Sequence, residues 1–202
     1  MNITFIHSIL ESIGIEYLSA SLKQNGHSVT LIFDPCVGET FRFHNRYLSH
    51  FLSCEDLVIE KTINSNPDLV CFSVYTDNYS WACRIARALK ERTNVPVLFG
   101  GIHTTLVPEK VIANHFIYYV CVGEGDLAMV RLVDSLNKKR LNLDGNLDNI
   151  WIKKGTEIIP PVNTRFIEDL DILPFPDKDL FFKEYPDFIK SVYTIITSRN
   201  CV

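Results

Sequence analysis

Residues 69–101 read LVCFSVYTDNYSWACRIARALKERTNVPVLFGG, and this stretch decides the fold. The apolar run Leu69–Ser73 is typical of a strand that is buried on both faces of a parallel sheet. Tyr79–Arg92 follows with the apolar spacing of a helix, and Val95–Phe99 is a second strand that leads directly into Gly100 and Gly101. A strand, a helix and a strand in this order predict two parallel strands joined by a right-handed crossover.

The same alternation covers residues 1–140. Further strands are predicted at Asn2–His7, Ser28–Phe33 and Tyr118–Val122, and further helices at Ile15–Gln24, Leu57–Asn64, after Pro108, and from Asp126 to about Asn137. Residues 34–55 show no clear period and are predicted to be a long loop with room for one short helix. We therefore expect an α/β fold, a flavodoxin-like (Rossmann-like), doubly wound parallel sheet of five strands in the order 2-1-3-4-5.

From residue 141 onward the pattern changes. Asn149–Lys153 and Thr156–Ile159 predict a β-hairpin, and the proline-rich stretch Asp169–Pro176 predicts an extended linker. Ser191–Thr197 is one further strand close to the end of the chain. We expect three parts: a ligand-binding domain over 1–140, a hairpin and linker over 141–190, and the first strand of another domain over 191–202.

Composition narrows the class of protein. The 202 residues are 47% hydrophobic and 22% charged, with a net charge of −4, which is typical of a soluble globular chain and offers no basic patch for nucleic acid. No apolar run is long enough for a membrane span, and the N-terminus lacks the features of a signal peptide, so we expect a cytoplasmic protein. The six cysteines show no CxxC spacing, and no disulfide framework is predicted.

Small and polar residues gather where the predicted strands end. Ser73 ends one strand, Gly100 and Gly101 end the next, and Gly123-Glu124-Gly125 follows the fifth. Paired glycines let a flat ligand lie against bare backbone, and backbone N–H groups at the start of a helix suit an anionic or amide-bearing group. Because parallel strands end at one edge of a sheet, these residues predict a ligand site there.

Residues 1–140 resemble the cobalamin-binding domain that precedes the radical S-adenosylmethionine (SAM) domain in class B radical SAM methyltransferases. The segments that carry the resemblance are Gly14–Leu18, Ser73–Tyr75, Gly100–Thr105 with Pro108-Glu109, and Gly123–Asp126. The resemblance implies that cobalamin is the ligand. It also implies the following cofactor-binding residues: Leu10, Glu11, Gly14, Ser73, Val74, Tyr75, Thr76, Gly100, Gly101, His103, Gly123, Glu124 and Gly125.

The end of the chain extends the resemblance. Leu173–Pro176 is similar to the family's Leu-Pro-x-Pro element, and Thr197–Cys201 resembles the Ser-Arg-Gly-Cys start of the CxxxCxxC motif, with Asn200 in place of glycine. The resemblance implies that Cys201 is the first [4Fe–4S] ligand of a longer enzyme that also uses SAM. The other two cluster cysteines are missing, so this chain alone is not the radical enzyme, and we expect it to be a part cut before the barrel.

The cobalt ligand is a point of difference from other cobalamin domains. Methionine-synthase-like domains carry D-x-H-x-x-G in the first loop, whereas alignment on Gly14 places Ile9 and Glu11 at the Asp and His positions. His7 lies seven residues before Gly14 and is interpreted as a strand-end histidine. We therefore expect cobalamin to bind base-off, without a protein histidine, above Leu10 and Glu11.

Each of two candidate ligand-binding residues has two possible interpretations. His103 either contacts the ligand or bonds to backbone at the start of a helix, and Glu124 either bonds to a corrin amide or ribose or caps the following helix. Two other functions of this fold are disfavoured. The sequence has neither the acidic residues that a phospho-receiver domain needs nor the phosphate loop that a flavin carrier needs. The alternative function is a stand-alone flavodoxin-like ligand-binding or regulatory domain for a nucleotide-type ligand.

Overall fold

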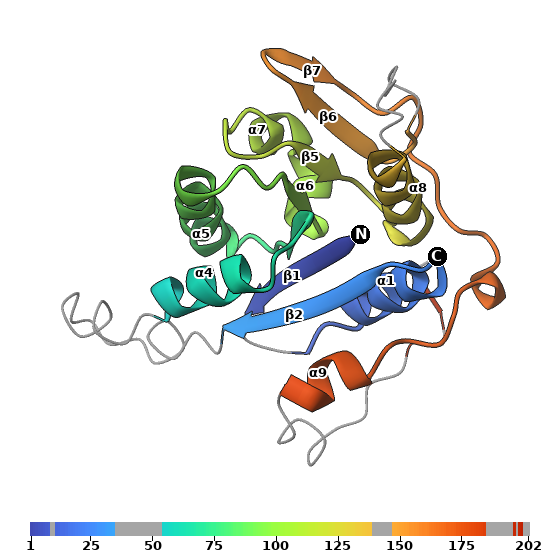
Figure 1. Cartoon of the computed structure of the whole chain (residues 1–202). Coiled ribbons are helices and arrows are strands. Elements are labelled where there is room, and N and C mark those ends of the chain that lie inside the picture. The colour runs from blue at the N-terminus through green and yellow to red at the C-terminus, as the bar shows by residue number, and fades with distance from the viewer. Residues whose placement is uncertain (9–10, 35–53, 139–146, 185–195, 197, 200–202) are drawn as a thin grey trace.

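In the computed structural model, a single seven-stranded sheet runs in the order β2-β1-β3-β4-β5-β6-β7 (Figure 1). The structure describes the whole chain except residues 9–10, 35–53, 139–146, 185–195, 197 and 200–202. The strands are β1 (Asn2–Ser8), β2 (Ser28–Asp34), β3 (Leu69–Ser73), β4 (Val97–Gly100), β5 (Tyr119–Cys121), β6 (Ile150–Lys154) and β7 (Glu157–Ile159). β1 to β5 are parallel, which confirms the flavodoxin-like fold and the predicted order 2-1-3-4-5.

Helices cover both faces of this sheet. They are α1 (Ile13–Gln24), α4 (Glu55–Asn64), α5 (Tyr79–Arg92), α6 (Ile102–Leu106), α7 (Pro108–Ile112), α8 (Asp126–Asn137) and α9 (Asp179–Glu184), with a 3₁₀ turn at Leu170–Ile172. Helices α4, α5 and α7 pack on one face, and α1, α8 and α9 pack on the other. None of the helices that the structure describes is long and apolar enough to cross a membrane.

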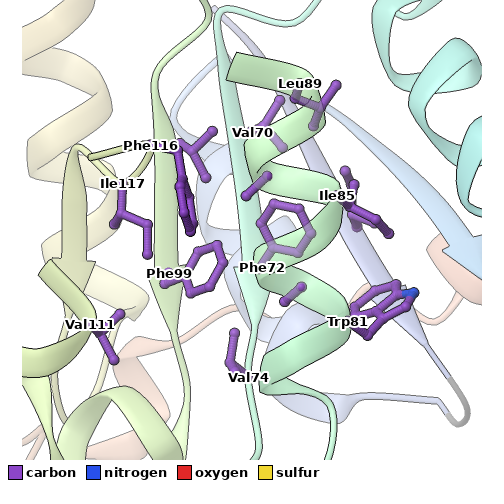
Figure 2. Packing of buried hydrophobic residues seen from close by; sticks show 14 of the residues in the cluster. Val70, Phe72, Val74, Trp81, Ile85, Leu89, Phe99, Val111, Phe116 and Ile117 are labelled. Atoms are coloured by element: carbon purple, nitrogen blue, oxygen red, sulfur yellow. The ribbon is translucent and has the colours of Figure 1, made fainter. Parts of the chain in front are cut away.

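The face under α5 shows why the strands are apolar at consecutive positions (Figure 2). Val70 and Phe72 of β3 point toward Trp81 and Ile85 of α5, and all four side chains are buried. Cys71, between them in sequence, belongs to the core on the opposite face, beneath α1 and α8. Alternate residues of one strand therefore serve two cores, as expected for a strand inside a doubly wound sheet.

The predicted hairpin forms, and it belongs to the main sheet. β6 pairs antiparallel with β5, and the register Val120↔Trp151 places Ile150 and Ile152 in the same core as α8. Gly155 has a φ of +60° in the two-residue turn, a conformation that glycine adopts without strain. The sheet is thus larger than the five strands predicted, because the apolar hairpin covers the edge that β5 would otherwise expose.

Three local features differ from the sequence prediction. β4 begins at Val97 because Pro96 has no N–H to donate to a ladder. The glycine pair at the end of β4 leads into a short helix, α6, which the sequence pattern did not predict. The predicted linker holds a further helix, α9, whose Phe181 is fully buried against β2. The predicted strand Ser191–Thr197, apart from Ile196, and most of the predicted loop 34–55 lie outside the described residues.

Candidate ligand pocket

A cavity of about 490 Å³ lies at the carboxyl ends of the central strands, on the face covered by α1 and α8. Its inner wall comes from β1, β3, β4 and β5, and its outer wall comes from the two helices. The lining residues are Phe5, Ile13, Gly14, Tyr17, Leu18, Cys71, Phe72, Ser73, Leu98, Gly100, Gly101, Cys121, Gly123, Glu124, Gly125, Asp126, Met129, Ile196, Ser198 and Arg199. The pocket therefore lies beside the β1–β3 switch point of the sheet, where ligands of this fold bind.

Glycines give the pocket its shape. A Cβ on Gly125 would lie 3.2 Å from Leu18 and 3.3 Å from the Cys121 sulfur, so this position has little room for a side chain. A Cβ on Gly100 would meet its nearest neighbour, the Cβ of Cys121, at an ordinary 3.6 Å, and a larger side chain there would extend into the cavity. Gly101 has a φ of +103°, and a Cβ there would lie 2.7 Å from the Val74 carbonyl oxygen, so its glycine is required by the backbone.

Two thiols line the wall between sheet and helices. Cys71 and Cys121 are both buried, and burial raises the pKa of each thiol, that of Cys121 to about 12. Both remain protonated at neutral pH and behave as small apolar groups rather than nucleophiles or metal ligands. Together with Leu98 and Met129 they make this wall suited to a flat, apolar ring.

Charged groups gather on the outer wall. The Arg199 guanidinium donates to Asp126 at 2.6 and 3.3 Å, lies 3.8 Å from Glu124, and stacks over the Tyr17 ring at 4.9 Å from its centroid. Asp126 begins α8, where the helix dipole also favours a carboxylate. Hydrogen bonds and ion pairs with these acids raise the pKa of Arg199, although burial opposes the shift.

The structure brings seven of the predicted site residues together around this pocket: Gly14, Ser73, Gly100, Gly101, Gly123, Glu124 and Gly125. Sequence reasoning missed Tyr17, Cys121, Met129 and Arg199. Tyr17 and Met129 carry only the apolar signal of a core helix, and Arg199 reaches the pocket from the far end of the chain. Leu10 and Cys201 lie outside the described residues.

Glu124 and Gly123 are already bonded within the protein. A Glu124 carboxylate oxygen accepts from the backbone N–H of Ile167 at 2.5 Å, and Gly125, the residue before α8, has no side-chain cap. The interpretation of Glu124 as a helix cap is therefore wrong, because its carboxylate tethers the segment after the hairpin. The N–H of Gly123 donates to the Thr105 hydroxyl at 3.0 Å, which makes it unavailable as the predicted ligand donor unless Thr105 moves.

The remaining predicted residues lie beside the pocket and do not line it. The His103 ring contacts the Thr76 hydroxyl through Nδ1 at 3.2 Å and stacks on Tyr79 with ring centroids 4.3 Å apart. Val74 accepts from the His103 backbone N–H at 3.2 Å, and the Tyr75 N–H donates to Asn78 at 2.7 Å. These contacts fix the loops after β3 and β4 against each other at the rim of the site.

Glu11 belongs to a buried ion cluster. The Lys178 ammonium lies 3.0 Å from Glu11 and 2.8 Å from Glu16, and the side chains of all three residues are at most 14% exposed. Burial, and then a hydrogen bond donated to Glu11, raises the pKa of Glu16 to about 8. Burial opposes a rise in the pKa of Lys178, but the two acids outweigh it and raise that pKa. The cluster ties the loop after β1 to the segment that precedes α9.

The described residues contain no group of three or more His, Cys, Asp and Glu side chains arranged to hold a metal ion. His7 is buried at the end of β1, with its ring edge-on to Tyr75 and Phe181 at centroid distances of 6.3 and 6.2 Å. It does not line the cavity. This position agrees with its interpretation as a strand-end histidine.

Comparison with known proteins identifies the family of this pocket. A sequence model of the B12 binding domain matches residues 2–133, which is more than half of the chain. An uncharacterized methyltransferase of Pyrococcus horikoshii is 29% identical over 192 residues, and an anaerobic magnesium-protoporphyrin IX monomethyl ester cyclase of Rubrivivax gelatinosus is 26% identical over 186 residues. The matches cover 94% and 85% of this chain, but only 38% and 31% of those relatives.

Solved structures share the fold. The cobalamin-dependent SAM radical enzyme OxsB, with aqua-cobalamin and SAM bound, superposes with a TM-score of 0.71 at 16% identity, over 93% of this chain and 25% of that one. The radical SAM methyltransferase TsrM of Kitasatospora setae, with cobalamin and a [4Fe-4S] cluster bound, gives 0.60 at 14% identity, over 82% and 30%. At these identities the likeness concerns the fold alone.

Proposed function

Because the chain belongs to the B12-binding domain family, we propose that its glycine-lined pocket holds the nucleotide tail of cobalamin. The observation that carries this proposal is the cavity beside Gly100, between the sheet and the helices α1 and α8. The apolar wall with Cys121 and Met129 fits the flat benzimidazole ring of that tail.

The chain's own residues have distinct roles in this proposal. Ser73 supplies a hydroxyl at the inner wall, and Gly14 lets the start of α1 lie close to the ligand. Val74, Tyr75, Thr76 and His103 form the rim, where mutual hydrogen bonds hold the two loops in place. Gly101 allows those loops to approach each other, since any side chain there would overlap the Val74 backbone.

We infer that cobalamin binds base-off and without a protein histidine on cobalt. His7, near the end of β1, is packed between the rings of Tyr75 and Phe181. Glu11, which the resemblance places beneath the corrin with Leu10, has its carboxylate on Lys178. An ion-paired carboxylate is a poor candidate for a cobalt ligand, because it would have to leave a buried partner.

We further propose that the chain is the cofactor domain of a larger radical SAM enzyme of methyltransferase type. The chain spans less than two fifths of the curated relatives it matches, and one of them is named a methyltransferase. In that enzyme Cys201 would be the first of three ligands of a [4Fe–4S] cluster, beside SAM. Cobalamin supplies cobalt-centred methyl transfer or radical chemistry, and this chain supplies its binding and orientation.

The test is retention of hydroxocobalamin after desalting, measured by visible absorbance of the protein fraction. The wild-type chain and Gly100→Ala should retain the cofactor, since a Cβ at this position makes only ordinary contacts. Gly100→Leu should lose it while circular dichroism stays unchanged, because its side chain extends into the pocket. Retention by Gly100→Leu would show that the pocket is assigned wrongly, and retention of flavin mononucleotide instead of cobalamin would favour the nucleotide-type alternative.

The same loaded protein tests the state of the cobalt. Electron paramagnetic resonance of the Co(II) form should show no superhyperfine splitting from an axial nitrogen. A three-line nitrogen pattern that disappears in His7→Phe would contradict histidine-off binding and identify His7 as the ligand.

A further inference from the structure

The pocket is bridged by a residue from the far end of the chain. Arg199 contacts Tyr17 of α1 and Asp126 of α8, the two helices that form the outer wall, and Asp126 is 73 residues away in sequence. Ile196 and Ser198 line the same cavity. Three described residues near the end of the chain therefore reach the pocket that we assign to the cobalamin tail.

This bridge is less exposed than an ordinary surface ion pair. The two terminal guanidinium nitrogens, Nη1 and Nη2, donate to the Asp126 carboxylate, and the exposed fractions of the Arg199, Glu124 and Asp126 side chains are only 18%, 12% and 5%. A forked and partly desolvated pair of this kind has defined geometry and resists screening by salt. By contrast, the Arg92–Asp56 pair elsewhere on the surface has exposed fractions of 46% and 86%.

We propose that Arg199 is a latch on the ligand pocket: its contacts with Asp126, Glu124 and Tyr17 bridge the outer wall, and a ligand tail enters when they release. The latch rests on the proposed function only for the identity of that ligand. All four side chains line the cavity, so a ligand that fills it replaces at least some of these contacts. The apparent affinity for the ligand is then reduced, because it is proportional to the fraction of molecules in which the latch is open.

The first test measures association of hydroxocobalamin with the 202-residue chain by stopped-flow absorbance. Arg199→Met keeps the apolar stem of the side chain and removes the charge and the fork. We expect it to raise the apparent affinity about tenfold, mostly through faster association. Arg92→Met, which breaks the exposed pair with Asp56, is the matched control and should behave like wild type. Equal binding by the wild type and Arg199→Met would overturn the latch.

The second test needs no cobalamin. Trypsin must take the Arg199 side chain into its own specificity pocket, so a latched Arg199 is protected from cleavage. Asp126→Asn should therefore accelerate loss of residues 200–202, followed by mass spectrometry, about tenfold over wild type. Asp56→Asn, the matched control, should leave the rate of this loss as in wild type. Equal cleavage of Asp126→Asn and wild type would overturn the latch. If no variant binds cobalamin, the proposed function fails, and the trypsin result alone decides on the latch.

Discussion

At the scale of single residues, Glu16 links the pH of the solution to the stability of the fold. Its side chain is fully buried beside Glu11 and Lys178, and its pKa is raised from 4.5 to about 8. Between these values the folded chain holds a proton that the unfolded chain releases. The free energy of unfolding should therefore fall as the pH rises through this window.

Glu16→Gln tests this linkage, because the amide is neutral at every pH. We expect wild type to lose about 2–4 kcal/mol of stability between pH 5 and pH 8 through this group, as measured by urea unfolding. Glu16→Gln should lack this part of the dependence of the free energy of unfolding on pH. Glu60→Gln, which removes an exposed carboxylate on α4, is the control and should keep the wild-type slope. A Glu16→Gln profile parallel to wild type would show that the carboxyl is ionised in the folded chain.

At the scale of elements, α9 anchors the segment between the hairpin and the C-terminus. Phe181 is fully buried, with its ring edge-on to those of His7 and Phe33 at centroid distances of 6.2 and 6.4 Å. Two residues before α9, Asp177 accepts from Ser19 at 2.6 Å and Lys23 at 2.5 Å. The segment is thus held on α1 by a hydrogen bond and an ion pair of Asp177, and on the sheet by an aromatic cluster.

Removing the aromatic anchor should destabilise the whole chain. We expect Phe181→Ala to lower the free energy of unfolding by about 3–5 kcal/mol, because it leaves a cavity beneath α9. Phe175→Ala removes the same side chain from the same segment, at a position that is 95% exposed, and should change stability little. Two similar urea midpoints for these variants would mean that α9 contributes nothing to global stability.

The elements also show what a single sequence can predict. Tyr79–Arg92 matched α5 residue for residue, and the apolar run Leu69–Ser73 matched β3, because their patterns are local and strong. The contact of Lys178 with Glu11 joins residues 167 apart, and no local pattern encodes it. The pocket was predicted in part. The glycines indicated the strand ends that form its inner wall, whereas Tyr17 and Met129 on the outer wall have the sequence pattern of ordinary core positions in a helix.

At the scale of the whole molecule, the pocket exists only when the sheet and its helices are assembled. The pocket is lined by four of its strands and two of its helices, and the hairpin closes the edge of the same sheet. A ligand that contacts so many elements is bound only by the folded chain. Its binding must therefore raise the free energy of unfolding as the concentration of free ligand rises.

Hydroxocobalamin should accordingly raise the melting temperature of the wild-type chain, followed by circular dichroism at 222 nm, a wavelength usual for helices. At a free concentration about a hundred times the Kd the gain is about 2.7 kcal/mol, which for a chain of this size corresponds to roughly 5–10 °C. Gly100→Leu should show no shift, and Gly100→Ala should follow wild type, since only the larger side chain extends into the cavity. Retention of cobalamin without any rise in melting temperature would mean that the cofactor binds the unfolded chain equally well, which a pocket assembled from distant strands and helices does not allow.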